Sequence, residues 1–279
     1  MGFPGLVGLF LIIANILFTY RGLKNTSFFD GYKFEVDKIL VYKDYKRLIT
    51  SSFLHVSWTH LFFNMLGLYF FSSTLEASVG PFIFLLIYFA CMVAGDLLTL
   101  LVHRNHGEYS SVGASGAVSG IIFASIALIP GMTIYFFIIP IWGWLYGLLF
   151  IAGSIYAIKT KKGNIGNESH LGGALMGMLV IFAIYPSAVI DNYVIVLLLT
   201  IPTIAFIILI IAKPHLLIID GFRSKKIEDH FTVDNKYNAQ KSIEKKEIDR
   251  ILDKISARGM KSLTPKEKET LEQYSKSSH

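Results

Sequence analysis

The stretch GASGAVSGIIFASIALIP, residues 113–130, is a continuous run of small and apolar residues interrupted only by serines. Its length falls within the roughly 17–25 residues that a helix needs to cross a bilayer. Because the bilayer core contains no water, a spanning segment must satisfy its own backbone groups, which only helices and closed barrels achieve. A continuous run favours a helix, since barrel strands alternate apolar and polar residues over about ten positions.

Six further apolar runs flank this stretch. Charged residues make up only 16% of the chain, against about 25% in soluble domains, and the mean hydropathy is +0.54. This composition excludes an ordinary soluble protein and a disordered chain. The sequence therefore predicts an all-α, polytopic helical membrane protein. The six further runs lie at residues 5–20, 59–75, 79–102, 132–158, 170–186 and 193–212.

The charged residues are distributed unevenly along the chain. More than half of them lie in residues 213–279, although this segment is only about a quarter of the sequence. We therefore expect a transmembrane domain at residues 1–212, followed by a charged soluble tail at residues 213–279.

Two patterns in the tail predict short helices. Apolar residues at helical spacing form the first pattern, and a threonine N-cap with a capping-box glutamate three residues later forms the second. These residues are Ile248, Ile251, Leu252 and Ile255 in the first helix, and Thr264, Pro265 and Glu267 in the second.

The net charge of +6 is compatible with a nucleic-acid partner, but the position of the basic residues argues against one. They flank apolar runs, where lipid headgroups attract them. The one cysteine, Cys91, lies inside an apolar run and cannot form an internal disulfide. No Cys and His residues have zinc-binding spacing, so the sequence indicates no zinc site.

His60 and Asn64 are polar residues within an apolar run, where such groups are costly and point to function. Their i, i+4 spacing places the imidazole and the amide on one helix face, so both can donate hydrogen bonds to one point. Arg47 and His55 precede them. A pair of polar groups that bridges two helices without any chemistry is an equally good interpretation.

Ser115 lies between Gly113 and Gly116 at the start of an apolar helix. Near a helix start, free backbone N–H groups and the positive end of the helix dipole favour a developing oxyanion. The string alone is a weak signal, because small residues are common at helix starts. It is not the Gly-x-Ser-x-Gly elbow of α/β-hydrolases, since position 117 is alanine.

His170, Gly173 and Gly177 share one helix face at i, i+3 and i+7. A histidine on such a smooth stripe can lie close against another helix, and Gly116 and Gly120 offer a matching stripe beside Ser115. The two stripes would bring serine and imidazole within hydrogen-bond reach, as in an activated nucleophile. Simple helix packing is the alternative for each stripe taken alone.

With these motifs in order, the sequence resembles the rhomboid family of intramembrane serine proteases. The resemblance covers residues 45–177. Its motifs are Arg47, His55, His60-x-x-x-Asn64, Glu76 before Gly80, Gly113-Ala114-Ser115-Gly116, and His170-x-x-Gly173-x-x-x-Gly177. Lys46 precedes Arg47, where the family often has tryptophan.

The resemblance implies a six-helix rhomboid fold, to which the run at 193–212 adds a seventh transmembrane helix. The core of the protease domain would lie at about residues 45–186. It implies that Ser115 is the nucleophile and His170 the general base, and that His60 and Asn64 line an oxyanion hole. Arg47 and Glu76 match positions with structural roles. No cofactor or metal is implied.

The expected function is therefore that of a serine endopeptidase in a bacterial plasma membrane. Its partners would be the lipid bilayer and transmembrane protein substrates, which it would cut within or near a membrane-spanning segment. Two alternatives remain at this point. One is an inactive rhomboid-like protein that binds transmembrane helices, and the other is a transporter, whose polar groups would line a path across the membrane.

Overall fold

The computed structural model describes residues 5–136, 139–160 and 166–212, together with residues 248, 251, 255, 263, 264, 267, 268, 270 and 271 of the tail. Contacts divide the chain into two units, Met1–Lys225 and Lys226–His279. The predicted boundary at residue 212 adjoins segments outside the described residues.

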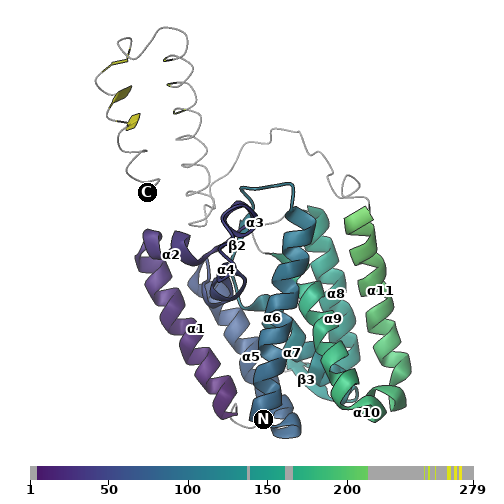
Figure 1. Cartoon of the computed structure of the whole chain (residues 1–279). Helices are drawn as coiled ribbons and strands as arrows, with labels where there is room; N and C mark the ends of the chain where they lie inside the picture. Colours follow the sequence, from purple (N-terminus) through teal and green to yellow (C-terminus); the bar gives the residue numbers. More distant parts are fainter. Residues whose placement is uncertain are drawn as a thin grey trace. The chain divides into compact units, whose positions relative to one another are not determined.

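Long helices form a bundle in the first unit (Figure 1). Shorter elements gather at its ends: α2, α3, α4 and β2 at one end, and β3 and α10 at the other. The long helices are α1 (Leu6–Lys24), α5 (Trp58–Val79), α6 (Pro81–His103), α7 (Ser115–Leu128), α8 (Gly143–Thr160), α9 (Asn167–Ile184) and α11 (Tyr193–Ala212). The short elements are α2 (Thr26–Tyr32), β1 (Phe34–Glu35), α3 (Val36–Leu40), α4 (Arg47–Thr50), the 3-10 helix η1 (Ser51–Phe53), β2 (Ser110–Ser111) and α10 (Pro186–Asp191).

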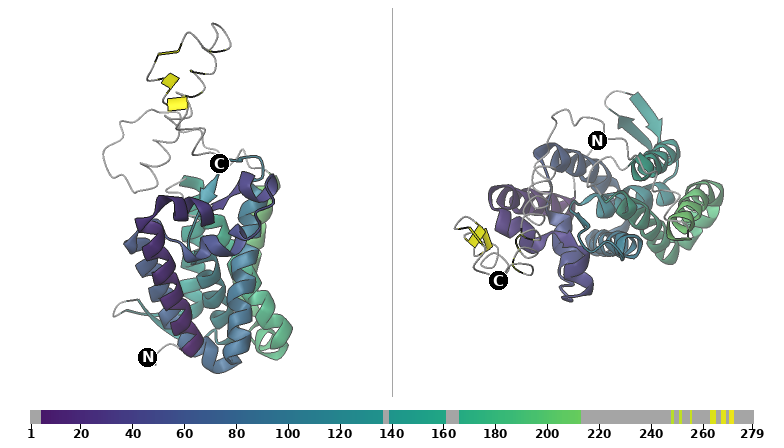
Figure 2. Two further views of the ribbon diagram at one scale, coloured as in Figure 1. Left: turned by 60° about the vertical axis from the view of Figure 1, so that its left-hand side comes forward. Right: turned by 90° about the horizontal axis from the view of Figure 1, so that it is seen from above.

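The prediction of a polytopic helical membrane protein is confirmed. Among the described residues, α1, α6, α9 and α11 are each long and apolar enough to cross a membrane. The helix α7 has only 14 residues and is therefore about 21 Å long, shorter than the hydrocarbon core of about 30 Å. It packs against α5, α6, α8 and α9, and its residues 116–127 are all buried. Figure 2 shows the bundle along its axis in the right-hand view.

The prediction of one helix over residues 132–158 is wrong for the part before Gly143. Residues Thr133–Phe136 (β3) and Ile139–Trp142 (β4) pair as antiparallel strands, and helix α8 begins only at Gly143. The run contains Pro140, which lacks a backbone N–H and would clash with the preceding helical turn. β-branched and aromatic neighbours favour strand pairing instead.

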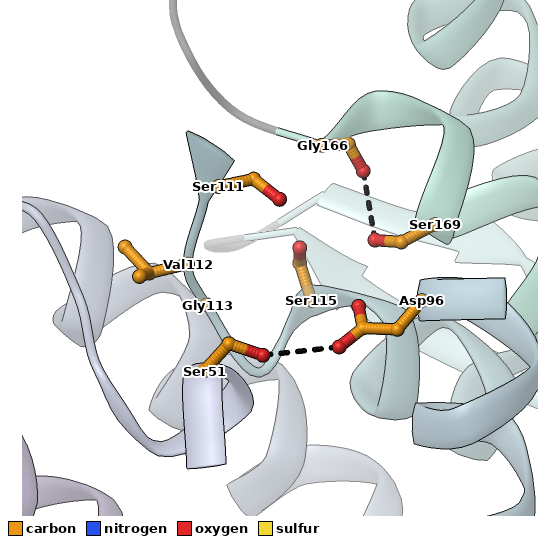
Figure 3. A pocket seen from close by; sticks show the side chains of 8 residues that line it. All are labelled: Ser51, Asp96, Ser111, Val112, Gly113, Ser115, Gly166 and Ser169. Carbon is orange, nitrogen blue, oxygen red and sulfur yellow. Dashed lines mark hydrogen bonds between the residues drawn. The ribbon is translucent and has the colours of Figure 1, made fainter. Parts of the chain in front are cut away.

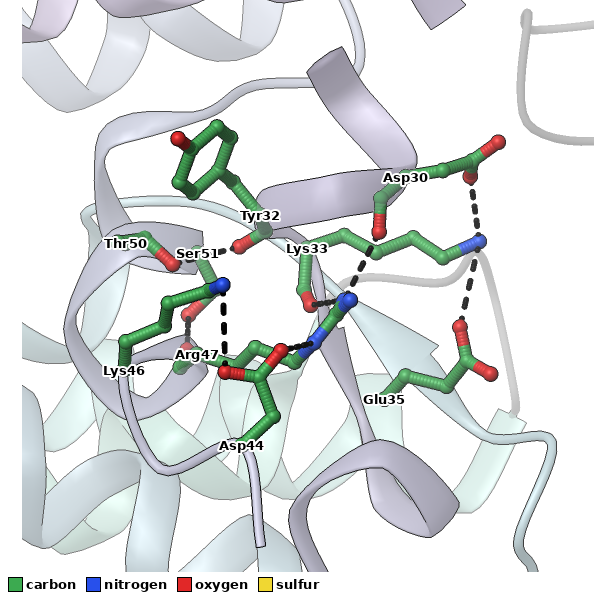
Figure 4. A network of polar contacts seen from close by, with 9 residues as sticks. All are labelled: Asp30, Tyr32, Lys33, Glu35, Asp44, Lys46, Arg47, Thr50 and Ser51. Atoms are coloured by element: carbon green, nitrogen blue, oxygen red, sulfur yellow. Dashed lines mark hydrogen bonds and ion pairs between the residues drawn. The ribbon is translucent and has the colours of Figure 1, made fainter. Parts of the chain in front are cut away.

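Arg47 connects the end of α2 with the turn at Asp44 in the long segment between α1 and α5 (Figure 4). Its Nη1 donates to the carbonyl oxygens of Asp30 (2.8 Å) and Lys33 (2.7 Å), and its Nε donates to Asp44 Oδ2 (2.9 Å). The side chain is buried, so these charge-assisted bonds satisfy a guanidinium that would otherwise be costly to desolvate. The geometry gives Arg47 an architectural role at the end of the bundle where α4 leads into η1.

Glu76 of α5 caps the beginning of α1. Its two carboxylate oxygens accept from the backbone N–H groups of Val7 (3.1 Å) and Gly8 (3.0 Å). Backbone N–H groups in the first turn of a helix have no partner within the helix, and a carboxylate there also opposes the helix dipole. The contact therefore fixes α1 against α5 at the bundle end opposite to Arg47.

Glycines allow α7 and α9 to pack backbone against backbone. A Cβ on Gly173 would collide with the carbonyl oxygen of Gly116, and a Cβ on Gly177 would collide with that of Gly120. Conversely, a Cβ on Gly120 would meet Cys91 and the carbonyl oxygen of Gly173. The two stripes predicted from their spacing therefore face each other directly.

Gly177→Ala tests this contact, because its methyl group would push α9 away from α7. We expect the free energy of unfolding to fall by about 1–3 kcal/mol, as for other overpacked sites. Thermal unfolding in detergent can be followed by the reaction of a thiol-sensitive dye with Cys91, which is fully buried in the fold. Gly153→Ala is the matched control, since nothing lies within 4 Å of its Cβ position. Equal unfolding midpoints for the two variants would contradict the role of the glycine contact.

Candidate active site

Ser115 is the first residue of α7, and an unusual backbone conformation precedes it. Gly113 has φ +135°, a region that L side chains rarely adopt, and Ala114 forms the N-cap. The chain enters this turn from β2, which pairs with β1 through Phe34 and Ser111. The Gly113 N–H donates to the carbonyl oxygen of Ser51 (3.1 Å). The backbone directly before Ser115 is therefore fixed both by the pairing of β1 with β2 and by the hydrogen bond to η1.

His55 connects this turn to α1. Burial, and after it the neighbouring His60, lowers the pKa of His55 well below its ordinary value, so its imidazole is neutral. Its Nε2 accepts from the Ala114 N–H (3.4 Å), which leaves the proton on Nδ1, and Nδ1 lies 2.9 Å from Thr19 Oγ1. Thr19 in turn donates to the carbonyl oxygen of Phe53 (3.2 Å). This chain of bonds fixes the backbone directly before Ser115.

The missing side chain of Gly113 leaves a gap between His60 and Ser115. A Cβ at this position would lie 2.9 Å from His60 Nε2 and 3.8 Å from Ser115 Oγ. Both ring nitrogens of His60 are buried and have no hydrogen-bond partner within the described part of the chain. Buried polar atoms without a partner are rare, so this gap suits a small polar atom, such as a substrate oxygen, that the imidazole can bind.

Asn64 lies one turn further along α5 and is buried. Its Nδ2 donates to the carbonyl oxygen of His60 (3.0 Å), a bond within the same helix. The i, i+4 spacing thus places both side chains on one face of α5, as expected. The amide is held by its own helix and not by a neighbouring one, so it is not the interhelical bridge of the alternative interpretation.

His170 lies in the first turn of α9, next to the contact between α7 and α9. Its Nδ1 is 3.3 Å from Ser154 Oγ of α8, and its ring packs against Phe150 with the centroids 5.5 Å apart. Its Nε2 is buried and has no hydrogen-bond partner among the residues that the structure describes. Because Gly116 approaches both Ser169 and Gly173, the structure brings His170 to the same end of this helix contact as Ser115.

A small polar pocket adjoins Ser115 (Figure 3). The side chains that line it come from η1, α6, β2 and α9, and include Ser111 and Ser169. Asp96 of α6 accepts from Ser51 Oγ (3.0 Å) at its base. Such a lining suits water better than hydrocarbon. The sequence gives one signal for this pocket, because Asp96 is an acidic residue within an apolar run.

Comparison with known protein families gives two matches. A model described as the Rhomboid domain matches residues 42–187, which are just over half of the chain. A second model, described as a family of unknown function (DUF6576), matches residues 231–277 of the tail.

Individual relatives come from organelles and from bacteria. The chain is 34% identical over 148 residues to RHOMBOID-like protein 12, mitochondrial, of Arabidopsis thaliana, which covers 47% of this chain and 44% of the relative. It is 32% identical over 150 residues to Rhomboid protein 1, mitochondrial, of Saccharomyces cerevisiae, or 50% of this chain and 43% of the relative. It is 26% identical over 180 residues to Rhomboid protease GluP of Bacillus subtilis, and this match covers 63% of this chain and 34% of the relative. The chain thus spans less than half the length of each of these relatives.

Gly113→Ala tests the gap beside Ser115. The added methyl group would strain the backbone at φ +135° and would lie 2.7 Å from Cε1 of His60. We expect the rate at which Ser115 reacts with a fluorophosphonate to fall about a hundredfold, since displacing a reacting group by about 1 Å costs that much. Gly131→Ala serves as the control, because nothing lies within 4 Å of its Cβ position. A rate within threefold of the wild type for Gly113→Ala would contradict this geometry.

Proposed function

We propose that this chain, which belongs to the rhomboid family, is an intramembrane serine endopeptidase that uses Ser115 and His170. The observation that supports the proposal is the glycine contact of α7 and α9, at the end where Ser115 begins α7, together with the His170 Nε2, which is buried and has no hydrogen-bond partner among the described residues. Its substrates would be other membrane proteins, cut within or near a transmembrane segment. Likeness to a protein named Rhomboid protease GluP supports the same activity.

In the proposed mechanism, His170 Nε2 removes the proton from Ser115 as Oγ attacks the carbonyl carbon of the scissile peptide bond. The carbonyl oxygen becomes an oxyanion in the gap left by Gly113, where His60, Asn64 and the backbone N–H of Ser115 would stabilise it. When the tetrahedral intermediate collapses, the imidazolium returns its proton to the leaving amine. An acyl-enzyme remains on Ser115.

Hydrolysis then requires water within an apolar bundle. The pocket beside Ser115 supplies polar surroundings for it, and His170 accepts the proton of the attacking water. Non-helical backbone and polar groups are tolerated at membrane depth only where protein covers them. Here the turn before Ser115 is covered by η1 and α5, and Ala114 is fully buried.

A bacterial plasma membrane is the proposed location of this multi-pass protein. The likeness to a Bacillus subtilis protein supports it, whereas the two relatives with higher identity are named as mitochondrial. Membrane fractionation of cells that contain the native chain distinguishes a bacterial plasma membrane from a mitochondrial membrane.

Ser115→Ala and His170→Ala should each abolish cleavage of a model transmembrane substrate in detergent, and the double variant should be no worse than either. Residues that act as one unit are non-additive in this way. Ser125→Ala is the matched control, because it removes a buried hydroxyl of α7 whose bond goes to its own helix at Ile121.

Appreciable cleavage by Ser115→Ala would overturn the assignment of the nucleophile. A wild-type protein that binds transmembrane helices but neither cleaves them nor reacts with a fluorophosphonate would instead be an inactive rhomboid-like protein.

His60→Ala and Asn64→Ala test the proposed oxyanion hole separately. Removal of one oxyanion donor costs about 10²–10³ in rate, so we expect losses of this size in kcat with the fold retained. The measurement is single-turnover acylation, which isolates the step in which the oxyanion forms. If both variants acylate at the wild-type rate, the two side chains do not stabilise the oxyanion and have only a structural role.

A further inference from the structure

Helix α8 presents two side chains to the His170 imidazole. Phe150 packs against the ring, with the centroids 5.5 Å apart and the planes inclined at 45°. One turn further along α8, Ser154 Oγ lies 3.3 Å from His170 Nδ1 and is buried. Their i, i+4 spacing puts both side chains on the same face of α8. This one helix therefore supplies both the aromatic contact to the imidazole and the partner of Nδ1.

The two ring nitrogens of His170 have different surroundings. Nδ1 has Ser154 as its partner, whereas Nε2 is buried and has no partner in the described ranges of the chain. A general base needs a free lone pair on the nitrogen that faces the nucleophile, so the proton of the neutral ring must reside on the other nitrogen. With Nδ1 protonated, Ser154 Oγ accepts the hydrogen bond and Nε2 is ready for Ser115.

A hydroxyl is suited to this position because it holds two lone pairs and a rotatable proton. It accepts from Nδ1–H in the neutral ring and continues to accept after Nε2 gains a second proton. The bond therefore persists throughout the reaction, as it does for the group that orients the histidine in a serine protease triad.

No carboxylate takes this part among the described residues near His170. Glu168 precedes His170 by two residues, but its Oε1 lies 3.3 Å from His103 Nε2 of α6. Its charge is therefore directed towards another imidazole. Ser154 is the side chain that contacts Nδ1.

Packing holds Ser154 in place relative to the helix that bears Ser115. Phe150 contacts Phe123 of α7 with ring centroids 5.8 Å apart, and Tyr146 contacts Phe71 of α5 at 6.0 Å. A Cβ on Gly147 would lie 3.3 Å from the side-chain Cδ1 of Ile126 of α7, so Ile126 also packs against α8 there. The oxygen that orients the imidazole is thus fixed by the same core that positions the nucleophile.

We propose that Ser154 is a positioning residue that holds His170 in the tautomer and orientation needed to deprotonate Ser115. The proposal rests on the proposed function of Ser115 and His170 and adds a third side chain from α8 to that pair. Loss of the hydroxyl releases the ring to populate the opposite tautomer, in which Nε2 carries the proton and cannot act as a base.

Kinetics of Ser154→Ala, Ser154→Thr and the control Ser125→Ala test the proposal on the full chain in detergent. For Ser154→Ala we expect kcat to fall about tenfold with KM within twofold of the wild type, as one neutral hydrogen bond warrants. Ser154→Thr keeps a hydroxyl and should recover most of kcat, and Ser125→Ala should match the wild type. A wild-type kcat for Ser154→Ala, or a loss that appears only in KM, would overturn the proposal.

Nitrogen NMR of protein labelled with ¹⁵N-histidine gives a readout that needs no activity. The His170 signals are identified by their absence in His170→Ala. We expect a ring protonated at Nδ1 in the wild type and a mixture of tautomers in Ser154→Ala. A wild-type ring protonated at Nε2, or an unchanged ring in Ser154→Ala, would overturn the proposal even if the threonine variant failed to fold. If instead the wild type neither cleaves nor reacts with a fluorophosphonate, the proposed function fails, while the NMR result still reports on this bond.

Discussion

The direct contact between the backbones of α7 and α9 is the constraint on which the site depends. In a bilayer, lipid tails are as apolar as leucine, so helices associate through close packing and not through the hydrophobic effect. Gly116 and Gly120 meet Gly173 and Gly177 with no room for a Cβ between them. Ser115 at the start of one helix and His170 at the start of the other therefore lie at the same end of this contact.

The polar groups around this contact are concentrated at one end of the bundle. Helices α2, α3 and α4 lie there, and β2 leads into the turn before Ser115 (Figure 1). Short elements bring backbone and side-chain partners into a region where unpaired polar groups would be costly. Arg47 and His55 satisfy buried backbone atoms from this end, and Glu76 does so for α1 at the opposite end.

Sequence periodicity predicted those parts of the structure that local spacing specifies. The facing glycine stripes and the shared face of His60 and Asn64 follow from helical repeats, and the capping box of the tail is present, with Thr264 N–H donating to Glu267 Oε2 at 2.8 Å. The run at 132–158 was misread because apolar length outweighed the helix-breaking effect of Pro140. Ser154 could not be found, because spacing along one helix does not specify which side chain of another helix it meets.

The central claim is that His170 activates Ser115 as the nucleophile, and mapping a fluorophosphonate adduct by mass spectrometry tests it most directly. The account predicts one phosphonylated residue, Ser115, in the wild type and no adduct in His170→Ala under the same conditions. An adduct on another serine, or one on Ser115 that forms equally fast without His170, would contradict it.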